Sequence, residues 1–257
     1  MIYKYYKDTS NHAINDFKNN RICFKHVSKF NDSFEFDALF DESISLEHTP
    51  LEYDGRKILS AQITEQKFRI RVFCASINGN NEHLWKNYAN DSRGFCLGYD
   101  ENEIKSQSNK IMMRRVEYSN EKPRLSCEDI KGSVINQIFH KSLDSDWPKE
   151  QELRIVLFLD ENDMTIERYN FECELQDYLT PSDYITIQTE ISINHNTKKN
   201  NELDIFERKT APLYVYLPIK PKLLIIGKDC PESLRNELES IANQKGIPIR
   251  NQGDKNA

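Results

Sequence analysis

Alternating apolar and polar side chains predict β-strands along most of the chain. The clearest alternation covers residues 68–76, FRIRVFCAS, in which every second side chain would point to the same face of a sheet. Similar short runs, rich in β-branched and aromatic residues, predict strands at residues 2–6, 22–26, 94–99, 111–118, 152–159, 213–217, 223–227 and 247–250. Because these runs extend from the first residues to the last, the predicted sheet must join distant segments of the chain.

Apolar residues at the spacing of a helical turn predict helices between several of these strands. The strongest stripes follow Ser126, which begins a capping-box-like sequence completed by Asp129, and Pro231, which is expected at the first helical position. Gly246 is expected to end the second of these helices. Shorter helices are predicted after Ser10, over residues 56–67 and over residues 83–89.

This mixture of strands and helices predicts an α+β fold with mixed or mainly antiparallel sheets and flanking helices. A chain of 257 residues has a length that one domain can accommodate. We expect a single α+β domain over residues 1–250, a polar, amide-rich insertion near residues 160–210, and a flexible tail at residues 251–257.

Charge and cysteine content exclude several classes of protein. The formal net charge is -6, which argues against the broad attraction to phosphate backbones that nucleic-acid binders need. The six cysteines include no C-x-x-C pair and no clustered histidines accompany them, so we expect no bound metal and a reducing compartment. The first residues lack the apolar core of a signal peptide and no apolar run is long enough to cross a bilayer. A cytoplasmic location without membrane attachment is therefore expected.

Two acids and an arginine near the start of the strand predicted at 152–159 form the first candidate site. Side chains alternate along a strand, so Glu150, Glu152 and Arg154 would point to one face. In a functional site, one carboxylate would orient a substrate hydroxyl while Arg154 keeps the partner acid ionised. A surface ion pair without a function fits the same pattern equally well.

Aromatic and amide residues supply two further candidate segments. Residues 30–35, FNDSFE, place Asn31, Asp32 and Glu35 beside two phenylalanines, and the same sequence fits a capped turn. Trp85 and Tyr88 stand three positions apart on a predicted helix and so share a face, either as core residues or as rings on which a base stacks. The common nucleotide-loop and hydrolase motifs, such as G-x-x-x-x-G-K-[ST] and G-x-S-x-G, are absent.

Six short blocks, taken in order, resemble the bacterial family catalogued as domain of unknown function 2971. They are YKY at 3–5, KFNDSFE at 29–35, LW with YA at 84–89, GFCLGYD at 94–100, Trp147 with E-x-E-x-R at 150–154, and LLIIG at 223–227. The resemblance spans nearly the whole chain. The sequence departs from the family pattern at Tyr6, where the family usually has Arg, at Ser33, where it usually has Pro, and at residues 74–76, where it has a Ser-rich turn.

The order of motifs is also similar to that of ADP-ribosyltransferases. This looser resemblance implies NAD as the substrate, Glu152 as the catalytic acid that contacts the nicotinamide ribose, and Glu150 as its upstream partner. Trp85 or Tyr88 would stack on the nicotinamide, and Ser76 would contact the substrate from a strand end. Lys4 stands where that superfamily has an Arg or His in its first motif. The complete set of expected substrate-binding residues is Lys4, Tyr5, Asn31, Asp32, Glu35, Ser76, Trp85, Tyr88 and Arg154.

Three functions follow from these observations. The first is an NAD-using transferase or NAD glycohydrolase of the toxin or phage-defence kind, acting on free NAD, a protein or a nucleic acid, with a partner protein as a regulator. The second is a non-catalytic module in which rings and amides hold a nucleotide or single-stranded nucleic acid. The third is a nuclease that holds Mg²⁺ with Asp32, Glu35, Glu150 and Glu152.

Overall fold

A computed structural model of the chain describes residues 1–30, 39–40, 62–63, 65–125, 129–143, 146–163, 165–170, 184–186 and 205–254. The strands are β1 Ile2–Tyr6, β2 Ile22–His26, β3 Leu39–Phe40, β4 Ile70–Ser76, β5 Phe95–Tyr99, β6 Ile111–Arg115, β7 Glu117–Tyr118, β8 Arg124–Leu125, β9 His140–Lys141, β10 Glu152–Phe158, β11 Thr165–Asn170, β12 Tyr184–Thr186, β13 Ile205–Pro212, β14 Tyr214–Leu217, β15 Leu223–Ile226 and β16 Ile249–Asn251. The helices are α1 Asn11–Lys18, α4 Glu82–Asn87, α5 Glu101–Ser106, α6 Ile130–Ile138 and α7 Glu232–Lys245, with short 3-10 turns η1 Val27–Lys29, η2 Trp147–Glu150 and η3 Glu161–Asp163.

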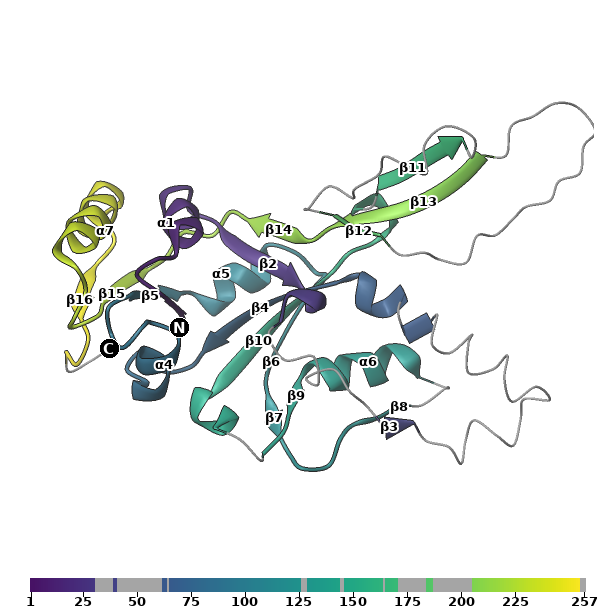
Figure 1. Ribbon diagram of the computed structural model, residues 1–257, viewed down its shortest axis with the longest axis horizontal. Coiled ribbons are helices and arrows are strands. Elements are labelled where there is room, and N and C mark those ends of the chain that lie inside the picture. The colour runs from purple at the N-terminus through teal and green to yellow at the C-terminus, as the bar shows by residue number, and fades with distance from the viewer. Residues whose placement is uncertain are drawn as a thin grey trace, which may run out of the picture.

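An open sheet of nine strands organises the molecule (Figure 1). Seven strands follow the order β14-β2-β4-β1-β5-β15-β16, and β10 and β6 extend the sheet from the other edge of β4. Every neighbouring pair in this sheet is antiparallel except β15 and β16. The prediction of an α+β fold with a mainly antiparallel sheet and several helices is therefore confirmed.

One edge of β4 is shared by two strands that diverge from each other. Near the start of β4, Val72 is paired with Lys25 of β2, whereas at its end Ser76 is paired with Tyr3 of β1. Residues 73–75 of β4 have no paired residue on this edge among the described strands, although β10 pairs with them on the other edge. The sheet is consequently open between β1 and β2, and the floor of the opening is the middle of β4.

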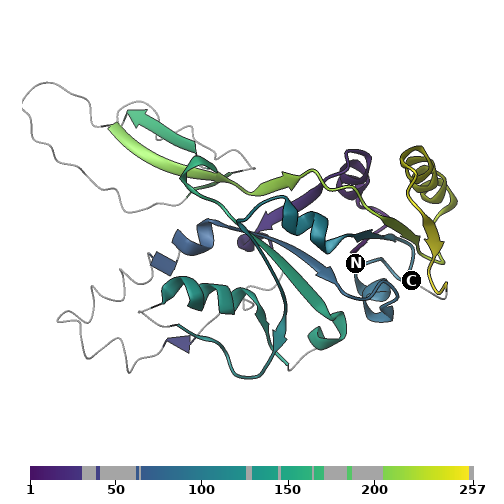
Figure 2. The ribbon, with the colours of Figure 1, turned by 180° about the vertical axis from the view of Figure 1, so that it is seen from behind.

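Helices cover both faces of the central strands because alternate side chains of β4 and β10 are apolar on each face. On one face Val72 and Val156 pack with Val134 and Ile138 of α6. On the other face Phe73 belongs to the larger core, which includes side chains from α1, α5 and α7. The views from front and back agree that α6 lies on one side of β4 and β10, while α1 and α5 lie on the other (Figure 1, Figure 2).

The predicted insertion contains strands of its own. Strands β11, β13 and β12 form a separate three-stranded antiparallel sheet, which projects from the nine-stranded sheet (Figure 2). At the other end of the prediction, β16 includes Asn251, the first residue assigned to the tail. Residues 171–183, 187–204 and 255–257 lie outside the described residues. The division into one domain with an insertion stays a prediction.

Two predicted helix starts are wrong, one by three residues and the other by one. The N-cap of α6 is Asp129, whose Oδ1 accepts a hydrogen bond of 2.8 Å from the Gly132 amide, so Asp129 caps the helix itself. Pro231 is the N-cap of α7 and not its first helical residue. Gly246 ends α7 in the left-handed conformation, with φ of 62°, as predicted.

The strand predicted at 111–118 is interrupted because the chain changes its hydrogen-bonding partner. Residues of β6 pair with β10 as far as Arg115. The Glu117 amide then donates to the Phe139 carbonyl oxygen at 2.7 Å, and β7 continues beside β9. The sequence does not signal this change, because both parts keep an extended backbone.

Candidate functional site

A cleft of about 340 Å³ lies where the sheet opens between β1 and β2. Its lining comes from β1, α1, β2, η1, the middle and end of β4, α4, β9, η2 and the first residue of β10. Charged side chains from seven of these elements line the same space. The cleft therefore joins segments that are separated by more than a hundred residues in sequence.

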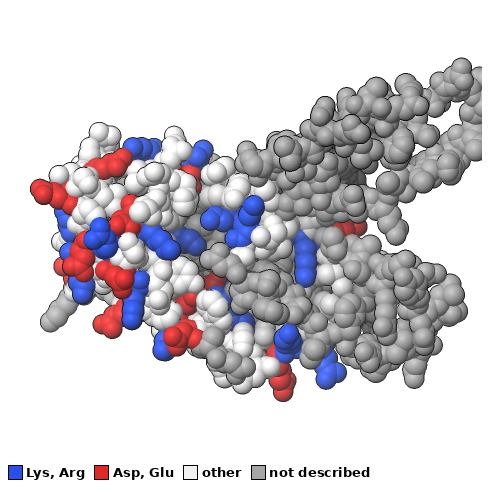
Figure 3. Space-filling view, viewed as in Figure 1, with Lys and Arg blue, Asp and Glu red and all other residues white. Residues whose placement is uncertain are grey.

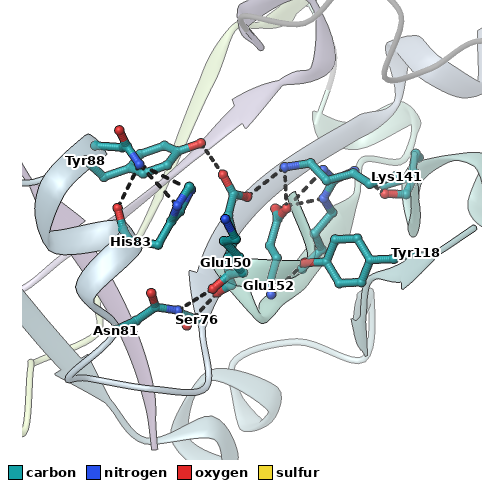
Figure 4. Close-up of polar contacts among 12 residues, drawn as sticks. Ser76, Asn81, His83, Tyr88, Tyr118, Lys141, Glu150 and Glu152 are labelled. Carbon is teal, nitrogen blue, oxygen red and sulfur yellow. Dashed lines mark hydrogen bonds and ion pairs between the residues drawn. The ribbon is translucent and has the colours of Figure 1, made fainter. Parts of the chain in front are cut away.

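Glu150 and Glu152 converge at one end of the cleft on a single lysine (Figure 4). Lys141 Nζ lies 2.9 Å from Glu150 Oε2 and 2.8 Å from Glu152 Oε2. All three side chains are buried, with only 5–6% of their surface exposed. Because two carboxylates this close would repel each other, the ammonium group between them stabilises the pair.

Arg154 completes the charge compensation from behind Glu152. Its Nε lies 2.9 Å from Glu152 Oε1 and its Nη2 lies 3.2 Å from Oε2, while Nη1 donates to the Ile138 carbonyl oxygen. Burial raises the pKa of Glu152, but the charges of Arg154 and Lys141 outweigh it and hold this pKa well below its usual range. Glu152 is therefore an ionised carboxylate at the edge of the cleft.

The prediction that Glu152 and Arg154 share a face of a strand agrees with these contacts, but the predicted position of Glu150 is wrong. Glu150 ends the 3-10 turn η2, and Gln151 adopts a left-handed conformation with φ of 49° before β10 begins. Glu150 reaches the same lysine through this bend and not through strand alternation. The end of β4 and the loop after it stabilise the bend, since Ser76 Oγ donates to the Glu150 carbonyl oxygen at 2.8 Å and Asn81 Nδ2 donates to the Lys149 carbonyl oxygen at 2.6 Å (Figure 4).

Tyr88 extends the acid pair toward solvent. It follows the last residue of α4, its hydroxyl donates to Glu150 Oε1 at 2.6 Å, and its side chain is 40% exposed. Burial of the hydroxyl and the charge of Glu150 raise the pKa of Tyr88, so the hydroxyl remains a donor. His83, on the same helix, forms its hydrogen bonds with Asn87 on the exposed side and does not line the cleft (Figure 4).

Trp85 lies in the core and not in the cleft, contrary to its predicted role as a stacking ring. Its side chain is 1% exposed, its ring packs edge-on against Tyr5 with 5.2 Å between centroids, and its Nε1 donates to the Gly79 carbonyl oxygen. Tyr5 is held in turn by its hydroxyl, which donates to the Asn78 carbonyl oxygen at 2.6 Å. Both residues stabilise α4 against β1, and Tyr88 is the ring of this helix that a ligand can reach.

The other predicted residues differ in their positions. Lys4, Tyr5 and Ser76 line the cleft, whereas Arg154 is fully buried and acts on the cleft through Glu152. Asn31, Asp32 and Glu35 lie outside the described residues. Phe30, immediately before them, lines the cleft.

Sequence reasoning missed Lys141 and Tyr118. Lys141 belongs to the two-residue strand β9, and its Nζ lies 4.2 Å from the centre of the Trp147 ring as well as between the two acids. Tyr118 Oη accepts a hydrogen bond of 2.9 Å from the Glu152 amide, and burial raises the pKa of its hydroxyl to about 12. Lys141 lies outside every predicted element, and Tyr118 is only the last residue of the strand predicted at 111–118, so no signal in a single sequence marks either as a site residue.

Comparison with known families recognises the part of the chain that runs from α4 to β10. Residues 84–155 match the model of a family described as Protein of unknown function (DUF2971). The expected resemblance is confirmed over these residues. The matched stretch includes Tyr88, Lys141, Glu150 and Glu152, so the acid end of the cleft lies within the family's own sequence pattern. No curated protein and no solved structure matches the chain.

Within the described ranges, no group of three or more His, Cys, Asp or Glu side chains is arranged to hold a metal ion. In the same part of the chain, no helix combines the length and the apolar character needed to cross a membrane.

The ion pairs of Glu152 predict how stability depends on pH. The pKa of Glu152 is lower in the folded protein than in the unfolded chain, so its contribution is fully present above the unfolded value of about 4.3 and is lost as the pH falls toward the folded value. We expect the free energy of unfolding, measured with urea, to decrease between about pH 5 and pH 2 more steeply in the wild type than in Glu152→Gln. The exposed-acid variant Glu237→Gln should retain the wild-type slope, and a Glu152→Gln slope equal to that of the wild type would contradict the assignment.

Proposed function

We propose that the cleft binds an NAD-like dinucleotide and that the protein cleaves the bond between nicotinamide and ribose, either by hydrolysis or by transfer of ADP-ribose. One observation carries the proposal: two acids bridged by Lys141, an accessible tyrosine ring and four further lysines line the same cleft. The likeness to ADP-ribosyltransferases in fold and activity, and an effector role of the toxin or phage-defence kind in the cytoplasm, belong to this proposal. So do a protein or nucleic-acid target and a regulatory partner.

The electrostatics of Glu152 suit the proposed reaction. Loss of nicotinamide leaves positive charge on the ribose, and a carboxylate that is already ionised stabilises that charge without a proton transfer. Lys141 and Arg154 keep Glu152 ionised and fix its orientation, while the carboxylate faces the cleft. In this mechanism Glu152 accepts a hydrogen bond from a ribose hydroxyl, and Tyr88 stacks on the departing ring.

The acid pair gives less support to a magnesium nuclease. Each carboxylate oxygen already has a donor: Glu150 contacts Tyr88 and Lys141, and Glu152 contacts Arg154 and Lys141. A magnesium ion needs several oxygen ligands and would have to displace these donors. A non-catalytic nucleotide module is the stronger second candidate, because aromatic rings from Phe30, Phe73, Tyr88 and Trp147 also line the cleft.

Incubation of the purified protein with NAD tests the proposal directly. We expect release of nicotinamide, followed by chromatography, at a rate that does not change when a chelator is added. Saturable binding of NAD without nicotinamide release would select the non-catalytic module. The absence of both NAD binding and nicotinamide release would refute the proposal. Cleavage of RNA or DNA that a chelator abolishes would select the nuclease.

A further inference from the structure

Four lysines besides Lys141 line the cleft. Lys4 projects from β1 and Lys25 from β2, the two strands that diverge at the sheet opening, and Lys7 and Lys29 also line the space. Among the described residues, Lys4 and Lys25 form no ion pair; Lys4 Nζ lies 5.4 Å from the centre of the Phe73 ring. An aromatic face orients an ammonium group but does not neutralise it.

The acids that line the cleft are engaged elsewhere. Glu150 and Glu152 are paired with Lys141 and Arg154, and Asp16 Oδ1 lies 2.7 Å from Arg21 Nε. Among the described residues, none of these acids forms an ion pair with Lys4 or Lys25, and both lysines add positive charge to the cleft although the whole chain has a net charge of -6. On the face seen in Figure 3, several blue Lys and Arg groups lie across the middle of the described surface, whereas most red Asp and Glu atoms lie toward the left, among further blue groups, and along the lower edge.

Lys4 and Lys25 influence the pKa values of titratable groups on both sides of the opening. Burial lowers the pKa of Lys4, and the charge of Lys25 lowers it further, against the opposing effects of Cys74, Glu152 and Glu150. Burial and the charges of Lys25 and Lys4 also lower the pKa of His12, on α1, although Asp16 opposes them. Cations held together in a partly desolvated space are stabilised by a bound anion.

We propose that Lys4 and Lys25, on opposite sides of the sheet opening, form a subsite for the phosphate groups of the ligand. The chemical class that fits is a pyrophosphate or a nucleotide phosphate, because two ammonium groups from diverging strands can approach two phosphate oxygens from opposite sides. The inference rests on the proposed function only in naming the pyrophosphate of a dinucleotide. It places the phosphates at the lysines and the glycosidic bond at Glu152.

Inorganic pyrophosphate is the probe that tests the subsite without any reaction. Calorimetric titration at low salt should show binding to the wild type that weakens as salt is added, since the contacts are ionic. The double variant Lys4→Met/Lys25→Met should bind pyrophosphate at least about tenfold more weakly, as expected for two lost charge-assisted hydrogen bonds. The control Lys105→Met/Lys228→Met removes the same net charge from exposed lysines outside the cleft and should bind as the wild type does.

Three results would overturn the subsite: no pyrophosphate binding by the wild type, equal binding by the cleft variant, or equal losses in the cleft and control variants. Lys25 is exposed, so Lys25→Met alone still tests the idea if the double variant does not fold, and Lys25→Arg should retain binding. Nicotinamide release from NAD is measured separately. Lysine-dependent pyrophosphate binding without release would refute the proposed reaction but keep the subsite, whereas release that is unchanged in the lysine variants would refute the subsite alone.

Discussion

Replacing Glu152 by Gln is expected to lower the rate of nicotinamide release from NAD at least about 100-fold. The substitution keeps the size of the side chain and most of its hydrogen bonds, but it removes the charge that would stabilise the ribose cation. The structure places this carboxylate at the cleft, where Arg154 and Lys141 hold its oxygens. When Gln replaces it, no other described acid occupies the same position to supply the lost negative charge.

A second substitution separates loss of charge from loss of fold. Glu152→Asp retains the negative charge that Arg154 needs, but it withdraws the carboxylate from the cleft by one methylene group. We expect Glu152→Asp to keep a circular dichroism spectrum and urea midpoint closer to those of the wild type than Glu152→Gln does, and still to lose most of its activity. Full-rate release by either variant would exclude Glu152 as the catalytic acid. The exposed-acid variant Glu237→Gln is the control for non-specific effects.

Replacing Arg154 by Met is expected to lower the free energy of unfolding by about 3–5 kcal/mol. Arg154 is fully buried, and its guanidinium group contacts both oxygens of Glu152 and a backbone carbonyl of α6. Methionine fills much of the same space but leaves Glu152 with one cation in place of two. Removing one partner of a buried carboxylate lowers the free energy of unfolding by more than the intact pair contributes to it, because the desolvation of the carboxylate is no longer compensated.

Urea denaturation followed by circular dichroism measures this cost, and a double-mutant cycle assigns it. Arg154→Met/Glu152→Gln should be destabilised less than the sum of the two single variants, since the second change removes the uncompensated charge. Arg93→Met is the matched control: Arg93 Nε lies 3.0 Å from Asp8 Oδ2, but the arginine is 52% exposed, so its loss should cost less than about 1 kcal/mol. Equal costs at Arg154 and Arg93 would contradict the assignment.

The sequence by itself determined the main strands around the site and the contact between Glu152 and Arg154. Strand periodicity places residues two apart on one face, so the side-by-side arrangement of Glu152 and Arg154 could be predicted from local pattern alone. The same reasoning located β1, β2, β4 and β10, because alternation and β-branched residues are properties of short segments. The helical spacing of Trp85 and Tyr88 was equally visible, but it could not tell which ring faces the core.

Only the tertiary structure decided what meets at the cleft. Lys141 comes between the acids because α6 returns the chain to the start of β10, and the cleft exists because β1 and β2 pair with different ends of β4. Glu150 joins the site through a left-handed residue that no periodicity predicts. Side-chain alternation is set by the local backbone, whereas pairing partners and the divergence of strands are set by contacts between distant segments, so the positions of β-strands can be predicted from a single sequence and the space between two of them cannot.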